Sequence, residues 1–266
     1  MNKSLVQQQF GAHAASYATS AVHAKGASLL RLIELVKPQR QWQGLDIATG
    51  AGHTAIAFAP HVAGIIASDV TDEMLTEAAK LAAQKGCGNI ETARADAEAL
   101  PFAASRFDLV SCRIAAHHFS DVAAFIAEAW RVLRPGGTFA LVDNVSPDDE
   151  STPGFASAEL AEAATLYNAF EKLRDPSHGR CLGLAEWSEL IATRGFHILH
   201  KERLPKGMEF DAWAGRMGTD PSTMERLRAT LMDGPPALKA FLRPQLEDGK
   251  LWFTLDEAII IAAKPR

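Results

Sequence analysis

The stretch LDIATGAGHTA, at residues 45–55, decides the fold of this chain. Its first residues form a short apolar run typical of a buried strand, and a helix is expected to begin near His53. Glycines at positions 50 and 52 allow the loop between them to turn tightly and to approach a ligand where any Cβ atom would collide. The free N–H groups at the start of the helix point to the same place. The stretch therefore predicts a strand, a ligand-binding glycine loop and a helix.

Further apolar runs follow at regular intervals: AGIIASD at 63–69, NIETARAD at 89–96, FDLVSCR at 107–113 and TFALVD at 138–143. Helical patterns separate them, and the clearest is an apolar stripe at helical spacing over residues 122–133. Five short buried strands separated by helices predict a parallel sheet with right-handed crossovers and helices on both faces. The runs at 196–204 and 251–264 indicate two more strands.

Charge and cysteine content exclude several classes of protein. The 266 residues include 27 basic and 32 acidic side chains, a net charge of −5, which argues against a nucleic-acid partner. Cys87, Cys112 and Cys181 are too scattered for a disulfide framework or a zinc site, and no metal is expected. No run approaches the roughly 18 apolar residues of a membrane span, and the polar start MNKSLVQQQ does not look like a signal peptide. We therefore expect a cytoplasmic protein.

Two acidic residues narrow the choice of ligand for the glycine loop. Gly50-x-Gly52-x-x-Ala55 satisfies a dinucleotide-binding pattern, and Asp69, at the end of the second strand, could accept hydrogen bonds from ribose hydroxyls. Either a nicotinamide or flavin dinucleotide or S-adenosylmethionine would fit this pattern. Asp46, at the end of the first strand, would repel a pyrophosphate but could serve the ammonium group of a methionine moiety, which favours S-adenosylmethionine.

Five segments resemble, in order and spacing, the motifs of class I S-adenosylmethionine-dependent methyltransferases: LDIATGAGH, ASDVTDEML, ADAEALPF, FDLVSCRIAAHHFSD and RVLRPGGTFALVD. The resemblance is strongest to the small-molecule branch with ubiquinone/menaquinone-type enzymes and covers about residues 40–145, although Ala48 and Thr49 replace the more usual Gly and Cys. It implies an α/β, Rossmann-like, doubly wound sheet of seven strands with an antiparallel last strand. The whole chain, 1–266, would be one domain: an N-terminal lid and helices at 1–40, a cofactor-binding core at 41–145 and a substrate-side region at 146–266 with a helical cap at 205–249.

The resemblance also implies cofactor contacts, position by position. The methionine end would be framed by Asp46, Ala48, Gly50 and Gly52, with Arg113 beside it. Asp69 would bind the ribose hydroxyls, and Val70 and Met74 would lie against the adenine. Asp96 would accept from the adenine amino group, and Ala97 would add a backbone contact. Phe10 and Tyr17 are seven residues apart, on one face of a helix that resembles a lid, with the Tyr17 hydroxyl near the methionine carboxylate.

His117 and His118 follow the fourth strand, where the methyl group of the cofactor is expected. Methyl transfer needs mainly positioning and exclusion of water, but a hydroxyl or protonated nitrogen acceptor also needs a base, and histidine suits neutral pH. Both histidines are therefore candidate catalytic residues. Candidate substrate contacts are Arg174 and His178, from a polar turn, and Trp213, from the cap.

The sequence thus predicts an enzyme that transfers a methyl group from S-adenosylmethionine to a small-molecule acceptor on oxygen, nitrogen or carbon. Two alternatives stay open at this point. One is an NAD(P)-dependent oxidoreductase, although the chain offers no Tyr-x-x-x-Lys pair to support it. The other is a non-catalytic binding module that retains a methyltransferase-like fold.

Overall fold

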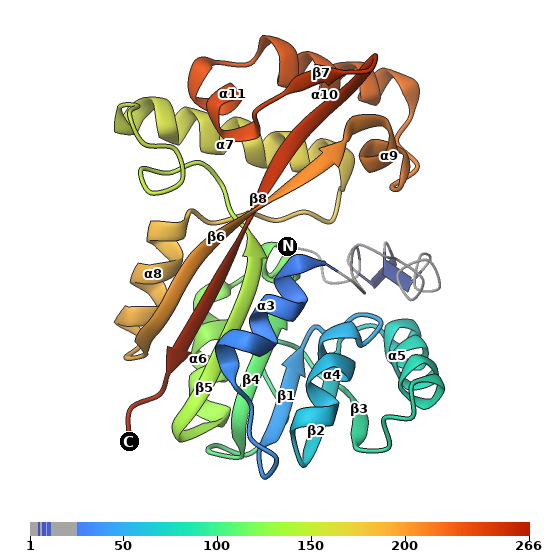
Figure 1. The fold of residues 1–266 in the computed structure, drawn as a ribbon, viewed down its shortest axis with the longest axis vertical. Helices are drawn as coiled ribbons and strands as arrows, with labels where there is room; N and C mark the ends of the chain where they lie inside the picture. Colours follow the sequence, from blue (N-terminus) through green and yellow to red (C-terminus); the bar gives the residue numbers. More distant parts are fainter. Residues whose placement is uncertain (1–4, 6, 9, 12–25) are drawn as a thin grey trace. The chain divides into compact units, whose positions relative to one another are not determined.

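The structure is a computed structural model that describes residues 5, 7, 8, 10, 11 and 26–266 (Figure 1). The chain forms two compact units. The first comprises the residues up to Asp143 together with Glu189–Glu202 and Ile259–Arg266. The second comprises Asn144–Ser188 and Arg203–Ala258.

One sheet has the strand order β3-β2-β1-β4-β5-β8-β6, and the first unit contains β1 to β4, β5 up to Asp143, residues 197–202 of β6 and residues 259–263 of β8. Its strands are β1 (Gln43–Ile47), β2 (Gly64–Asp69), β3 (Ile90–Arg94), β4 (Phe107–Arg113), β5 (Leu133–Asn144), β6 (His197–Glu209) and β8 (Lys250–Ala263). Neighbouring strands from β3 to β5 pair in parallel. Figure 1 shows β8 running opposite to β5. The predicted doubly wound sheet with an antiparallel last strand is therefore confirmed, and the short strand β7 (Gln245–Glu247), which pairs with β8, brings the sheet from the predicted seven strands to eight.

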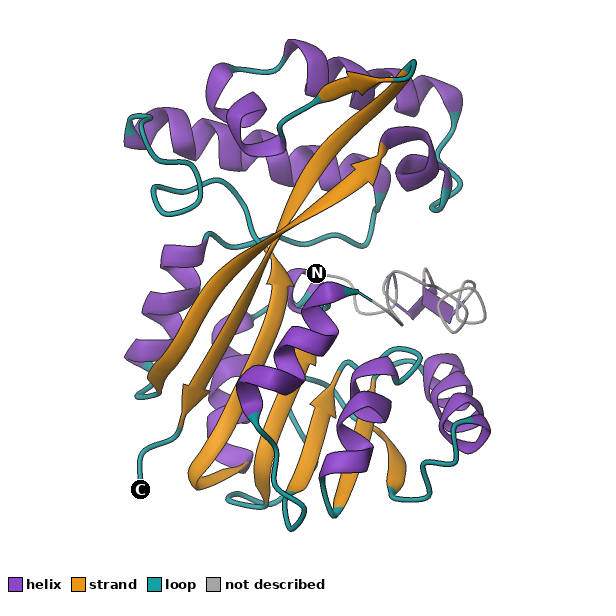
Figure 2. Cartoon of the chain, in the orientation of Figure 1, coloured by secondary structure: helices purple, strands orange, loops and turns teal. Residues whose placement is uncertain are grey.

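Helices of the first unit cover both faces of this sheet (Figure 2). They are α3 (Ala27–Val36), α4 (His53–Phe58), α5 (Asp72–Gln84) and α6 (Val122–Val132), and α8 (Leu184–Thr193) belongs partly to this unit. Leu32 of α3 and Phe58 of α4 join a core cluster with strand residues such as Leu109. Phe125 of α6 packs edge-on against Phe139 of β5, with ring centroids 5.9 Å apart. Burial on both faces explains why the strands have near-continuous apolar sequences.

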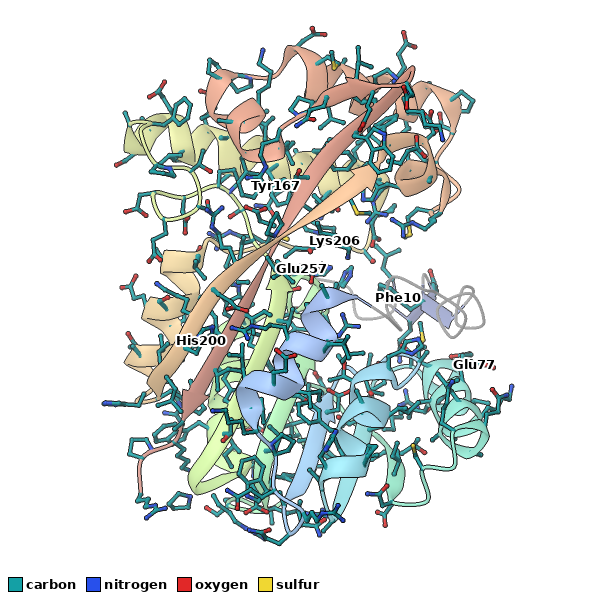
Figure 3. The ribbon with its side chains drawn as sticks, in the orientation of Figure 1. Phe10, Glu77, Tyr167, His200, Lys206 and Glu257 are labelled. Carbon is teal, nitrogen blue, oxygen red and sulfur yellow. The ribbon has the colours of Figure 1, made fainter. Side chains whose placement is uncertain are left out.

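The second unit consists of helices and a hairpin. Its helices are α7 (Ser157–Arg174), α9 (Phe210–Gly215), α10 (Pro221–Asp233) and α11 (Pro236–Leu242), and β7 (Gln245–Glu247) pairs antiparallel with β8. Tyr167 and Phe170 of α7 are buried among other aromatic side chains. Ion pairs between β6 and β8 flank this core: Nζ of Lys206 lies 2.8 Å from Oε1 of Glu257 (Figure 3). The helices α9, α10 and α11 lie within the segment 205–249, for which the sequence predicts short helical pieces.

Within the described part of the chain, no helix combines the length and the apolar character needed to cross a membrane.

Candidate functional site

A pocket lies in the first unit, at the carboxyl ends of the parallel strands, where open α/β sheets bind their ligands. Its walls come from the glycine loop after β1, the start of α5, the loop after β3 and the segment after β4. The space between the walls is about 1080 Å³, part of it open to solvent.

The two glycines of the loop have different structural roles. Gly50 has a φ of +54°, and a Cβ atom built on it would meet nothing within 4 Å, so this position leaves the pocket open for a ligand. Gly52 has a φ of +85°, but its Cβ atom would lie 3.0 Å from the Cβ of Ala78 in α5. Gly52 therefore permits close packing of the loop on α5, whereas Ala48 and Gly50 line the pocket.

Asp46 lies behind the loop and is not part of the pocket wall formed by the described residues. Its side chain is buried, and its two oxygens accept hydrogen bonds from the hydroxyls of Thr49, at 2.5 Å, and Ser111, at 2.6 Å. Burial raises the pKa of Asp46 to about 6, although the two hydroxyls act in the opposite direction. Its carboxylate fixes the shape of the loop from the side away from the pocket.

Asp69 lines the pocket and holds two of its walls together. One carboxylate oxygen accepts from the backbone N–H of Gly50 and the other from that of Thr71, both at 2.9 Å. Burial raises the pKa of this carboxyl group above its ordinary value, against these hydrogen bonds. The hydroxyl of Thr71 and the backbone N–H of Val70 also act on this carboxylate. As a group that only accepts hydrogen bonds, it is suited to the hydroxyls of a ribose. Val70 and Met74, which follow Asp69 along the chain, also line the pocket.

The loop after β3 forms the next wall through Asp96 and Ala97, the two residues expected from the sequence to contact the adenine. The side chain of Glu98, for which the sequence predicts no role, accepts from the backbone N–H groups of Ser120 (2.6 Å) and Asp121 (3.0 Å). Glu98 thereby ties this loop to the segment that precedes α6. The position of Glu98 in ADAEALPF is visible in the sequence, but its partners lie more than twenty residues further along the chain.

Arg113 also lines the pocket. Its Nε donates to the hydroxyl of Thr54 at 3.2 Å and its Nη1 to the hydroxyl of Ser28 at 3.4 Å. The guanidinium group is therefore oriented by α3 and α4. Neither hydroxyl is indicated by the sequence patterns around it.

The two adjacent histidines occupy different environments on the short 3-10 turn Ala116–His118. His118 lines the pocket, whereas His117 is not part of the pocket wall among the described residues. His117 is only 8% exposed, and its Nδ1 lies 2.6 Å from Oδ1 of Asp143 at the end of β5. The sequence patterns do not distinguish the two histidines, and they give no sign of the contact with Asp143.

Described residues of the N-terminal segment reach this pocket. The ring of Phe10 (Figure 3) lines it and lies edge-on to the ring of His118, with centroids 4.9 Å apart. Nε2 of Gln7 donates to the backbone oxygen of Val70 at 2.8 Å. The other predicted lid residue, Tyr17, lies outside the described residues.

The three candidate substrate residues lie in the second unit, each in an interior contact of that unit. The guanidinium of Arg174 lies 4.4 Å from the ring centroid of Trp213. Trp213 is 1% exposed and stacks on Phe170 at 5.0 Å. His178 is 2% exposed, and its Nε2 lies 3.0 Å from Oδ1 of Asn168. Arg174 and Trp213 contact each other, and both contribute to packing.

The chain is similar to known proteins over most of its length. Residues 45–141 match a family described as "Methyltransferase domain". The chain is 37% identical to the uncharacterized methyltransferase YcgJ of Bacillus subtilis over 219 residues, which are 82% of this chain and 81% of the relative. The crystal structure of YcgJ superposes with a TM-score of 0.79, covering 90% of this chain and 98% of that one at 33% identity. The ubiquinone/menaquinone biosynthesis C-methyltransferase UbiE of a Marinomonas species is 34% identical over 110 residues, 40% of this chain and 44% of the relative.

A doubly wound sheet with a glycine loop after its first strand and a pocket carboxylate after its second defines an enzyme that binds a nucleoside-containing cofactor. The similarities to known proteins then identify the family: the chain belongs to the S-adenosylmethionine-dependent methyltransferases. Its cofactor is S-adenosylmethionine. The donor set of the pocket fits this molecule, because Gly50 leaves an open cradle and Asp69 offers carboxylate oxygens for a ribose. An oxidoreductase and a non-catalytic module are therefore set aside.

Proposed function

We propose that this methyltransferase acts on a small-molecule acceptor that enters the pocket beside His118. The observation that carries the proposal is that His118 and Phe10 line the same pocket as Gly50 and Asp69. An acceptor bound against these two rings would lie next to the cofactor. The net charge of −5 also favours a small molecule over a nucleic acid.

The residues that would hold the cofactor follow from the pocket wall. Asp69 would accept from the ribose hydroxyls, Asp96 would accept from the adenine amino group, and Val70 and Met74 would pack against the adenine. Arg113 would lie near the methionine portion. When bound, the cofactor supplies an electrophilic methyl group on a sulfonium sulfur. The neutral thioether that remains after transfer is a good leaving group.

The remaining work falls to the protein, which must orient the acceptor and exclude water. For an acceptor that carries a proton, Nε2 or Nδ1 of His118 would take it as the new bond to the methyl group forms. Phe10 would cover the acceptor from the N-terminal segment, which we propose closes over the site together with Tyr17. The second unit, with its helices in 205–249, is proposed as the substrate-side region, to which Arg174, His178 and Trp213 belong.

A metabolite screen with methyl-labelled S-adenosylmethionine tests this proposal. We expect the wild type to transfer label to at least one compound in a small-molecule extract, and Gly50→Leu to transfer none, because the new side chain would fill the cradle. Gly50→Ala is the matched control, since it introduces the same backbone strain at positive φ with less bulk. Label appearing only in the protein or RNA fractions would contradict a small-molecule acceptor.

A further inference from the structure

We propose that Asp143 is a positioning residue of the methyl-transfer site, which acts through His117 to hold His118 against the acceptor. The catalytic part of this inference rests on the proposed function. The arrangement of the three side chains, and the main test of it, depend on neither acceptor nor cofactor.

The first step is the link between Asp143 and His117. Asp143 lies near the end of β5, in the first unit, and it is 1% exposed. Its Oδ1 lies 2.6 Å from Nδ1 of His117, and its Oδ2 has no hydrogen-bond partner in the described part of the chain. A buried carboxylate is costly unless it accepts hydrogen bonds. The bond from His117 is therefore strongly favoured, and it requires the proton on Nδ1.

The second step is what this bond does to the imidazole. A histidine ring carries its proton on either nitrogen, and the partner of one nitrogen decides the state of the other. A carboxylate that accepts from Nδ1 fixes both the tautomer and the orientation of the ring. A buried aspartate has this function in catalytic triads, where it positions a histidine without itself transferring a proton.

The third step leads from His117 to the pocket. The ring centroids of His117 and His118 are 4.2 Å apart, and the ring planes are inclined by 47°. His118 also contacts Phe10, and of the two histidines it is the one in the pocket wall. A ring held between neighbours has few alternative rotamers. By fixing His117, Asp143 thus restricts the orientation of His118 from within the core.

The arrangement divides the roles of the adjacent histidines. His118 is the candidate catalytic residue, because it alone of the pair lines the pocket. His117 and Asp143 are positioning residues. Removal of the Asp143 charge should therefore change the rate of methyl transfer without changing the binding of the cofactor, whose proposed contacts lie on other strands.

The main test is imidazole ¹⁵N NMR of the protein without ligands, with His117→Gln and His118→Gln used for assignment. We expect the wild type to show a strongly deshielded Nδ1 proton on His117, because short hydrogen bonds to carboxylates have this effect. In Asp143→Asn this deshielded signal should disappear. Asp121→Asn is the matched control: this N-cap of α6 lies three residues after His118, and asparagine caps equally well. The proposal is overturned if His117 carries its proton on Nε2, or if Asp143→Asn leaves the signal unchanged.

Kinetics with an acceptor from the screen provide the second test. We expect Asp143→Asn to lower kcat by about tenfold or more while the Kd for S-adenosylhomocysteine stays within about twofold of the wild type. Asp121→Asn should leave both values unchanged. A parallel loss of kcat and cofactor binding would indicate a merely structural role and overturn the proposal. If instead the wild type methylates no small molecule while the NMR result holds, the proposed function fails and the Asp143–His117 pairing stands.

Discussion

Asparagine in place of Asp46 should make the stability of the protein less dependent on pH. Burial raises the pKa of this carboxyl from 3.8 to about 6. An acid whose pKa is raised by folding stabilises the protein fully below its unfolded pKa, and this contribution is lost as the pH rises through the folded value. This rise in the pKa of Asp46 corresponds to about 3 kcal/mol in the free energy of unfolding. Asparagine keeps the shape and an acceptor for Ser111 or Thr49 but cannot ionise.

The assay is urea unfolding of the wild type and Asp46→Asn between pH 4 and pH 8. The free energy of unfolding of the variant, relative to that of the wild type, should rise by about 2.4 kcal/mol from about pH 4 to about pH 7, because part of the full effect is already lost at pH 4. Asp72→Asn corrects for the loss of one carboxyl group, because that side chain is exposed. A difference between Asp46→Asn and the wild type that stays constant across this pH range would refute the reasoning.

Three further changes have defined outcomes. Gly52→Ala should lower the free energy of unfolding by at least about 1 kcal/mol in denaturant melts, because it combines a φ of +85° with a contact to Ala78; an unchanged midpoint would contradict this. Glu128→Gln should destabilise the protein by about 1 kcal/mol at neutral pH. Hydrogen bonds from Arg131 lower the pKa of Glu128, so the stabilisation by this carboxylate is present above the ordinary pKa of glutamate and is lost as the pH falls through the lowered value. In urea melts, the difference in the free energy of unfolding between the wild type and Glu128→Gln should therefore shrink in acid. A difference that grows in acid would contradict this. Phe10→Ala should weaken binding of S-adenosylhomocysteine by roughly fivefold in calorimetry, because the ring shares the pocket wall with the cofactor residues, and equal affinity would exclude contact between this ring and the cofactor.

The fold and much of the pocket wall could be predicted because their signals are local. The glycine loop, the carboxylate at the end of β2 and the ADAE segment each occupy a few consecutive residues, and parallel topology brings such segments to one edge of the sheet. Ala48, Asp69 and Asp96 accordingly line the pocket. Arg113 does as well, because it immediately follows β4.

The remaining features depend on contacts between distant residues. Asp143 meets His117 across 26 residues, and Ser111 meets Asp46 across 65, so no short motif contains both partners. The sequence also could not separate His117 from His118. On a 3-10 turn, adjacent side chains point in different directions, and which one faces the pocket depends on the packing of the turn.

The most direct test of the central claim is calorimetric titration of S-adenosylhomocysteine into the wild type, Asp69→Asn and Asp72→Asn. Asp72 lies three residues after Asp69, on the exposed side of α5, where it pairs with Arg94. We predict 1:1 binding to the wild type and to Asp72→Asn, and binding weakened by about 30-fold or more for Asp69→Asn, because hydrogen bonds to a buried charged group contribute about 2–3 kcal/mol. The melting temperature of each variant without ligand controls for loss of the Asp69 bonds to Gly50 and Thr71. No heat with the wild type, or equal affinity in all three proteins, would contradict a cofactor site at the end of β2.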